Sequence, residues 1–480
     1  MDNDNYKTKI AEYKIMINKS DSNLNKYLKE LGAIYEKINM FYEAIVECYI
    51  KIIQIEPDNL TIINQIGVCY FNLSQFKLAI HYFKKVIKIK EHPDVCNNLS
   101  NCYANIKDYQ SAEKILLISY GLDKNNNTTK SSLLQLYYYM KKYDESINIF
   151  KKIKNPEDKQ KYNISFVYLA KKQFQKGFGL YETRLHHNNI NVQTGLKDRV
   201  DIPNIKYWDG KQPCKNLLVV YEQGIGDNIQ YYRFIVELAN KYPNMQIYYF
   251  CKDIISRLFK IHTNINIIST IILTNYDNYV YIMSLPKLMN ITNICPNITN
   301  YIHTNNDKMN YWVNTFSSLK RFKVGFVYNG LLSSFIEKYI PLIDFECLCE
   351  LNIDLICIHR KNDIEKDINT ISQKFKDNLH FFDIDNNSEP FEDTICILQN
   401  IDLLITIDTF IVHLAGILDV KTWLLLGKYS EWRWSDDKKL TYWYNSVELM
   451  RVEEEIDLKN ILSSVKTKLS FLIDNISSKV

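Results

Sequence analysis

Apolar, aromatic and small residues recur along the first 190 residues with a period near 34. Five tyrosines lie at spacings of 35, 33, 34 and 31, namely Tyr35, Tyr70, Tyr103, Tyr137 and Tyr168. Nine residues after each tyrosine comes a small residue, with an aromatic shortly before it; the small residues are Ala44, Ala79, Ala112, Ser146 and Gly177. A small residue lets two helices approach closely while an aromatic fills the groove between them. The pattern therefore predicts a stack of helix pairs.

This ladder resembles the tetratricopeptide repeat. Residues that the repeat pattern favours stand at Gly32, Gly67, Phe83, Phe150, Pro57 and Pro93. The resemblance implies an α-solenoid over residues 1–190, whose concave face binds a protein or peptide partner. Alternatively, the repeats only extend and cap the domain that follows, and the period alone does not separate these two roles.

The remaining residues alternate short apolar runs with helical patterns. Strands are predicted at Leu217–Tyr221, Gln246–Cys251, Ile265–Ile268, Tyr279–Met283, Lys323–Tyr328, Asp354–Ile358, Leu403–Ile407 and Thr422–Leu426. Alternation of this kind predicts parallel sheets, and a polar stretch from Asn290 to Lys308 divides them into two sets. We therefore expect a linker over 191–213 and two Rossmann-like domains, 214–320 and 321–480. The fold class predicted is α plus α/β.

The first strand of this region leads into a turn with two glycines, Gly224 and Gly226, followed by Asp227. Glycines let the turn tighten and let backbone pass close to a ligand. Asp227 either caps a helix that begins at Asn228 or, beside an open cleft, acts as a general base. The complete GxGxxG fingerprint of dinucleotide-binding domains is absent because Ile229 replaces its last glycine, which disfavours a nicotinamide enzyme.

A second turn follows the strand Leu403–Ile407. Asp408 ends this strand and Thr409 starts a helix, so the amides of Thr409 and Phe410 are available to a diphosphate. His413 lies four residues after Thr409, on the same helix face, and is either a donor-binding or a structural residue.

The two turns together resemble the paired signatures of a known glycosyltransferase domain. The matching segments are Glu222–Arg233 and Asp408–Gly416, with Tyr207–Gly210, Glu431–Trp434 and Trp443–Tyr444 beside them. This domain follows tetratricopeptide repeats in many bacterial proteins and is similar to the lipopolysaccharide heptosyltransferases and, more distantly, to the O-linked N-acetylglucosamine transferases. The resemblance implies a GT-B fold, in which two Rossmann-like domains face a cleft, and an inverting transfer from a nucleotide-sugar to a hydroxyl.

Carried onto this sequence, the resemblance gives Asp227 the role of catalytic base. The donor site is expected to contain Asp408, Thr409, Phe410, His413, Lys338 and Arg360, and no cofactor or metal is expected. Instead, the helix dipole and a cation, either Lys338 or Arg360, would stabilise the leaving diphosphate of a UDP-, GDP- or ADP-sugar. The loop 329–338 departs from the family pattern, which leaves a second hypothesis open: a non-catalytic interaction scaffold with a degenerate GT-B domain.

Three tryptophans, Trp432, Trp434 and Trp443, either stack on a base or sugar or pack in the core; the sequence favours packing.

Composition narrows the class of protein further. The net charge is only +4, with 59 basic and 55 acidic residues, which argues against a nucleic-acid partner. Eleven cysteines without a CxxC pair are typical of a reducing compartment. No apolar run approaches the length of a membrane span, and the polar N-terminus does not resemble a signal peptide. The expected location is the cytoplasm. The chain has 13 glycines and 10 prolines against 35 tyrosines, with abundant Asn, Ile and Lys, which is typical of AT-rich coding sequences. If this bias reflects a viral source, the expected location is the host-cell cytoplasm.

Overall fold

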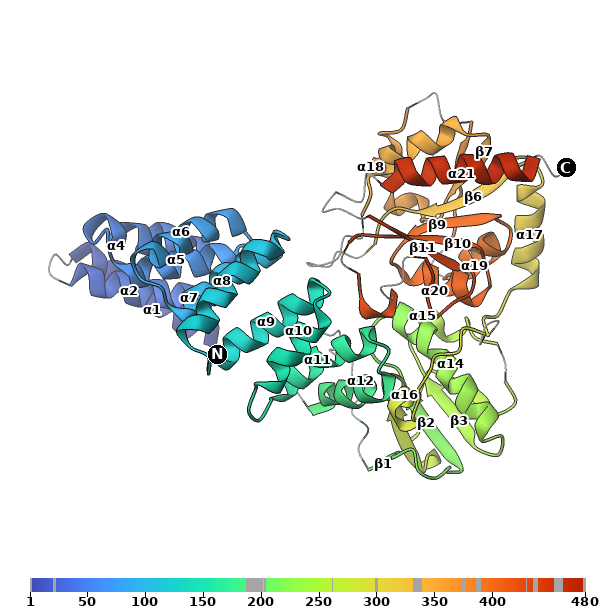
Figure 1. Ribbon diagram of the computed structural model, residues 1–480, viewed down its shortest axis with the longest axis horizontal. Coiled ribbons are helices and arrows are strands. Elements are labelled where there is room, and N and C mark those ends of the chain that lie inside the picture. Colours follow the sequence, from blue (N-terminus) through green and yellow to red (C-terminus); the bar gives the residue numbers. More distant parts are fainter. Residues whose placement is uncertain are drawn as a thin grey trace. The chain divides into compact units, whose positions relative to one another are not determined.

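The computed structural model describes residues 2–19, 23–186, 202, 204–260, 262–297, 301–330, 339–372, 377–385, 390–428, 430–434, 439–452 and 461–477. The chain forms two compact units, Met1–Pro156 and Glu157–Val480 (Figure 1).

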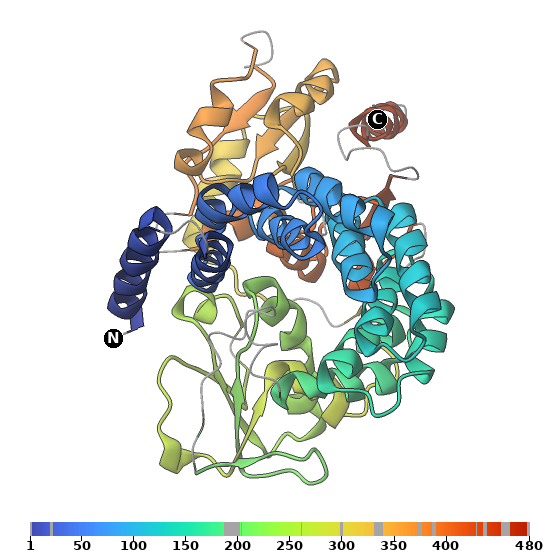
Figure 2. The ribbon, with the colours of Figure 1, turned by 90° about the vertical axis from the view of Figure 1, so that its left-hand side faces the viewer.

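The first unit consists of antiparallel helix pairs that stack side by side in a curved row (Figure 2). Its helices are α1 (Asp2–Lys19), α2 (Leu24–Lys37), α3 (Phe41–Glu43), η1 (Ala44–Tyr49), α4 (Ile50–Ile55), α5 (Leu60–Asn72), α6 (Phe76–Ile89), α7 (Pro93–Asn105), α8 (Tyr109–Leu122), α9 (Asn127–Tyr139) and α10 (Tyr143–Lys151). The segments α3, η1 and α4 follow one another without a break and act as one helix. The helical repeat predicted from the tyrosine ladder is confirmed.

Each tyrosine of the ladder marks the end of the first helix in its pair. The residue four positions after it has a positive φ, at Asn39, Ser74, Lys107, Lys141 and Lys172. The next amide then donates to the tyrosine carbonyl, as from Met40 to Tyr35 at 2.8 Å and from Gln75 to Tyr70 at 2.9 Å. A left-handed residue followed by such a bond is a Schellman-type helix end. The same turn therefore recurs with the period of the ladder.

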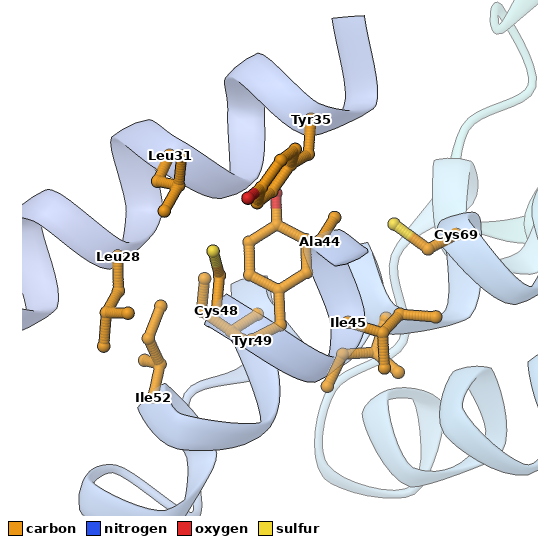
Figure 3. Packing of buried hydrophobic residues seen from close by; sticks show 11 residues of the cluster. Leu28, Leu31, Tyr35, Ala44, Ile45, Cys48, Tyr49, Ile52 and Cys69 are labelled. Carbon is orange, nitrogen blue, oxygen red and sulfur yellow. The ribbon is translucent and has the colours of Figure 1, made fainter. Parts of the chain in front are cut away.

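The small residues of the repeat lie where helices meet. Ala44, Ala79 and Ala112 are fully buried. A Cβ at Gly32 would lie 2.5 Å from the Tyr49 ring, and one at Gly67 would lie 2.7 Å from the Phe83 ring. Figure 3 shows the first of these cores, in which Tyr35 and Tyr49 lie among aliphatic side chains of α2 and the helix that follows.

The last helix pair groups with the second unit. It comprises α11 (Asp158–Ala170), α12 (Phe174–Tyr181) and the turn η2 (Glu182–His186). Arg184 of η2 is fully buried and donates to both carboxylate oxygens of Glu222, at 2.5 and 3.2 Å, and to Ser284 Oγ at 2.8 Å. This charged cluster joins the helix pair to the start of the first glycine turn.

The first sheet is entirely parallel. Its strands are β1 (Lys206–Tyr207), β2 (Asn216–Val220), β3 (Gln246–Phe250), β4 (Ile265–Ile268) and β5 (Asn278–Tyr281), in the order β1-β5-β2-β3-β4. The chain leaves β2 on one side for β3 and returns on its other side as β5, so a topological switch point lies at the carboxyl end of β2. Strand β1 lies within the predicted linker, where Trp208 N also donates to Tyr279 O. Residues 187–201 and 203 of the linker region lie outside the described residues.

The second sheet has six parallel strands. They are β6 (Phe322–Val327), β7 (Ile353–Cys357), β8 (Leu379–Phe381), β9 (Leu403–Ile407), β10 (Thr422–Leu426) and β11 (Val447–Arg451), in the order β11-β10-β9-β6-β7-β8. Its switch point lies between β6 and β9. Helices of this unit are α14 (Ile225–Lys241), α15 (Asp253–Ser256), α16 (Leu285–Leu288), α17 (Asn306–Phe316), α18 (Glu365–Ile368), α19 (Glu392–Gln399), α20 (Phe410–Ile417) and α21 (Ile461–Ser477).

The predicted fold class is confirmed: a helical repeat precedes two parallel sheets, consistent with two Rossmann-like domains. The domain boundaries at 190, 213 and 320 stay predictions. None of the described helices is long and apolar enough to cross a membrane.

Candidate functional site

A cavity of about 720 Å³ lies at the carboxyl ends of strands from both sheets. Its lining includes residues just after β2, β3, β6, β7, β8 and β9, represented by Tyr221, Lys252, Asn329, His359, Ile384 and Asp408. This volume is in the range of small-molecule sites, and switch points of parallel sheets are where such ligands bind. The turn Gly224–Asp227 and the turn Asp408–Phe410 line the same cavity, although the strands before them are far apart in sequence.

Asp227 lies in the first turn of α14, which begins at Ile225 rather than at the predicted Asn228. Its Oδ2 accepts a hydrogen bond from the amide of Gly224, the residue before the helix, at 3.1 Å. The carboxylate therefore caps the helix from inside its first turn, and 18% of the side chain remains exposed toward the cavity. Capping leaves further lone pairs on both oxygens.

Thr409 precedes α20, as the sequence predicted. Its Oγ1 is buried and makes no hydrogen bond to any residue in the described part of the chain. The first amides of a helix have no partner within the helix, and here they follow Thr409, which lines the cavity together with Phe410 and Ile411. This end of α20 can therefore donate hydrogen bonds to an anion, with the positive end of the helix dipole behind them.

The two turns touch each other. A Cβ at Gly226 would lie 3.1 Å from Cδ2 of His413 and 3.4 Å from Cα of Phe410. A side chain at position 226 would therefore require the neighbouring atoms to shift by a few tenths of an ångström. The second glycine of the first turn lets α14 and α20 approach closely without this shift.

His413 is 3% exposed and held on two sides. Its Nδ1 lies 2.9 Å from the hydroxyl of Tyr444, and its ring stacks on Trp434 at 5.4 Å with an interplanar angle of 16°. The ring also contributes to the cavity wall. These contacts fit a structural residue that closes the donor end of the cavity, and a donor-binding role for His413 stays a prediction.

Arg433 is the site residue that sequence reasoning missed. It lies in the turn η9 (Trp432–Trp434), and its Nη1 is 2.9 Å from Asp227 Oδ1 and 3.2 Å from Gln230 Oε1. Its Nε is 2.9 Å from Glu431 Oε2. The motif around it, Glu431–Trp434, contributes to the family resemblance, but the sequence suggests a ligand contact only for its tryptophans.

Arg360 also lines the cavity, after β7, and its Nε lies 3.1 Å from Asp363 Oδ2. Its side chain is 53% exposed, so it is accessible to a ligand at the cavity mouth. Lys338, the other predicted donor cation, lies outside the described residues, as does most of the loop 329–338.

Two further cavity residues were not singled out in the sequence, His359 and Asp385. His359 Nε2 accepts the Tyr328 amide at 3.3 Å, and burial lowers the pKa of the imidazole to about 4. Asp385 accepts from the amides of Asp393 and Thr394 at the start of α19, while burial raises its pKa. Neither residue had a motif that could have revealed it.

The three tryptophans considered as ligand contacts, Trp432, Trp434 and Trp443, are packed in the interior. Trp432 is 6% exposed, and Trp434 and Trp443 are fully buried. None of these three tryptophans is among the residues that line the cavity. The interpretation as core packing is confirmed.

No group of three or more histidine, cysteine, aspartate or glutamate side chains in the described ranges is arranged to hold a metal ion. All eleven cysteines are free thiols.

Comparison with known proteins supports the repeat and gives likenesses for both parts of the chain. Residues 60–93 match the family model described as the tetratricopeptide repeat. The comparison with curated proteins finds no match.

Among solved structures, a tetratricopeptide repeat protein from Parabacteroides merdae is 16% identical, over 41% of this chain and 84% of that chain, with a TM-score of 0.36. A structure of MamA is 19% identical, over 34% of this chain and 97% of that chain, with a TM-score of 0.30. The ADP-heptose lipopolysaccharide heptosyltransferase II of E. coli is 12% identical, over 53% of this chain and 99% of that chain, with a TM-score of 0.39.

Proposed function

We propose that the chain is a glycosyltransferase that moves a sugar from a nucleotide-sugar to a hydroxyl acceptor. The observation that carries this proposal is the juxtaposition of Asp227 and Thr409 in one cavity: a carboxylate on the first domain faces an anion-binding helix start on the second. Such a pair supplies a base for the acceptor and a site for the leaving group, which are the two requirements of the reaction.

In the proposed reaction, the acceptor hydroxyl attacks the anomeric carbon of the donor sugar. The new C–O bond forms as the bond to the diphosphate oxygen breaks, and the diphosphate leaves with that electron pair. Asp227 takes the hydroxyl proton. Attack from the face opposite the leaving group inverts the anomeric configuration.

The leaving diphosphate would be stabilised without a required metal. The amides at the start of α20 and the Thr409 hydroxyl, which lacks a partner among the described residues, supply hydrogen bonds. Arg360, at the cavity mouth, supplies positive charge. Asp408, Phe410 and His413 shape the wall around this position. UDP-, GDP- and ADP-sugars all meet these requirements.

The helical repeat would recruit a protein or peptide partner on its concave face, in a reducing, cytoplasmic compartment. The free thiols and the repeat architecture support this part of the proposal. The competing function is a non-catalytic scaffold that keeps the same repeat but no longer turns over a donor.

A binding screen tests the proposal. The full chain is melted in the presence of UDP-, GDP- and ADP-sugars, because a ligand that binds only the native state raises the melting temperature by mass action. Thr409→Val is the matched variant, since it removes the hydroxyl and keeps the shape. We expect one class of nucleotide-sugar to stabilise the wild type and to stabilise Thr409→Val less. If no nucleotide-sugar shifts either protein, the scaffold is the better account.

A further inference from the structure

The turn η9 contacts both of the predicted site regions at once. Arg433 reaches Asp227 and Gln230 on α14, while the neighbouring Trp434 stacks on His413 of α20. The turn Trp432–Trp434 therefore supplies both Arg433, which bonds the Asp227 carboxylate, and Trp434, which supports His413 in the cavity wall.

Arg433 is held in place independently of Asp227. Arg451 donates to the carbonyl of Trp434 and to Ser430 Oγ, both at 2.7 Å, and so anchors the backbone of the turn. Burial by itself lowers the pKa of the Arg433 guanidinium, but Glu431, Asp227 and Asp408 together raise it well above its usual value. Arg433 is therefore a permanent positive charge that cannot take part in proton transfer.

The Asp227 carboxylate is bound at both oxygens. Oδ2 accepts from the Gly224 amide and Oδ1 accepts from Arg433. Together these bonds fix the plane of the carboxylate, and the remaining lone pairs stay available for an acceptor hydroxyl. One bond comes from its own helix and the other from the opposite domain.

We propose that Arg433 is the positioning residue for Asp227 and orients the carboxylate toward the acceptor. This inference rests on the proposed function. Arginine suits the role because Nη1 donates to both Asp227 and Gln230, and the planar guanidinium fixes the direction of these two bonds. A lysine would supply the charge but not the orientation.

Charged and phenolic groups from several elements surround this ion pair. The charges of Glu431 and Asp408 act on Arg433. The charge of Asp227 acts on Tyr231 of α14 and on Tyr162 and Tyr181 of the last helix pair. Arg433 contacts Asp227 directly, so its loss would remove the bond that holds Oδ1.

The test measures nucleoside diphosphate release from the nucleotide-sugar that the binding screen selects. It compares the full-length wild type with Arg433→Met, Arg433→Lys, Asp227→Asn and Arg451→Lys. We expect Arg433→Met to lower kcat by about 10²-fold, the scale of a misplaced reacting group, and to leave the donor KM nearly unchanged.

The conservative variants separate positioning from structure. Arg433→Lys should restore only part of kcat, with the donor KM of the wild type. Arg451→Lys should loosen the turn, seen as a lower melting temperature, and lower kcat less than Arg433→Met does. A raised donor KM with unchanged kcat in Arg433→Met would overturn the inference, while Asp227→Asn still tests the base. If the wild type itself releases no diphosphate, the proposed function fails and this inference fails with it.

Discussion

Gly416 and the ring of Tyr444 are in such close contact that no side chain fits between them. A Cβ at Gly416 would lie 2.3 Å from Cγ and 2.5 Å from Cδ1 of the ring. Tyr444 is fully buried, and its hydroxyl lies 2.9 Å from His413 Nδ1. Gly416, near the end of α20, therefore leaves the room that the Tyr444 ring occupies. In that position the Tyr444 hydroxyl holds His413 in the cavity wall.

Gly416→Ala is expected to destabilise the protein. Overpacking of a rigid buried ring costs about 1–3 kcal/mol, which exceeds the gain of up to about 1 kcal/mol from replacing glycine by alanine in a helix. Urea unfolding measures the difference. Gly427→Ala is the matched control, because no atom lies within 4 Å of a Cβ there. Equal stability of the two variants would contradict the described packing of α20.

The buried ion pair between Arg184 and Glu222 predicts a large effect of a single substitution. Arg184→Met leaves Glu222 charged and buried without its partner, which typically costs about 3–5 kcal/mol. Arg360→Met removes an exposed pair and should cost at most about 1 kcal/mol. The midpoints of urea unfolding compare the two variants. Similar midpoints would mean that η2 is not anchored to the first sheet through this pair.

His359 predicts a specific dependence of stability on pH. Its pKa is about 4 in the folded chain, against 6.5 in the unfolded chain. As the pH falls below 6.5, the unfolded chain binds the proton first. The stability that neutral His359 contributes is therefore complete above pH 6.5, decreases between pH 6.5 and 4, and is constant below that range. The change amounts to at most about 3 kcal/mol.

His359→Gln removes this contribution, and the glutamine oxygen can still accept the Tyr328 amide. The free energy of unfolding is measured at pH 7 and pH 4.5 for the wild type and the variant. We expect a smaller difference between the two pH values in the variant. His92→Gln, at an exposed histidine of the repeat, should keep the wild-type difference. A His359 variant with the same slope as the wild type would mean that the imidazole is not held neutral.

The sequence predicted two kinds of feature: helices that recur with a fixed period, and strands that end at a polar residue. The tyrosine ladder located each helix end because a left-handed residue follows each tyrosine at the same distance. Buried parallel strands such as Leu403–Ile407 were found because they are continuous apolar runs that end at a polar residue. These strand ends then located the cavity and most of its predicted residues.

Short edge strands and contacts between distant segments could not be predicted from local sequence patterns. β1, β8 and β11 were missed because two to five residues at a sheet edge carry little pattern. The start of α14 was predicted three residues late because Ile225 and Gly226 are not typical of a helix start. The bond from Arg433 to Asp227 joins residues 206 positions apart, so no local pattern could reveal it.

The central claim is tested most directly by the rate at which the full chain releases nucleoside diphosphate from a nucleotide-sugar, with and without the Asp227 carboxylate. A general base contributes about 10²–10⁴-fold, so Asp227→Asn should slow release by that factor. The asparagine can still accept the Gly224 amide, but the ion pair with Arg433 is lost, so the melting temperature should fall. The increase of that temperature with nucleotide-sugar should stay close to that of the wild type. Release by the wild type that is lost in Asp227→Asn, with ligand-induced stabilisation retained, is the predicted result. No release by the wild type from UDP-, GDP- or ADP-sugars, or the same rate in both proteins, would contradict the account.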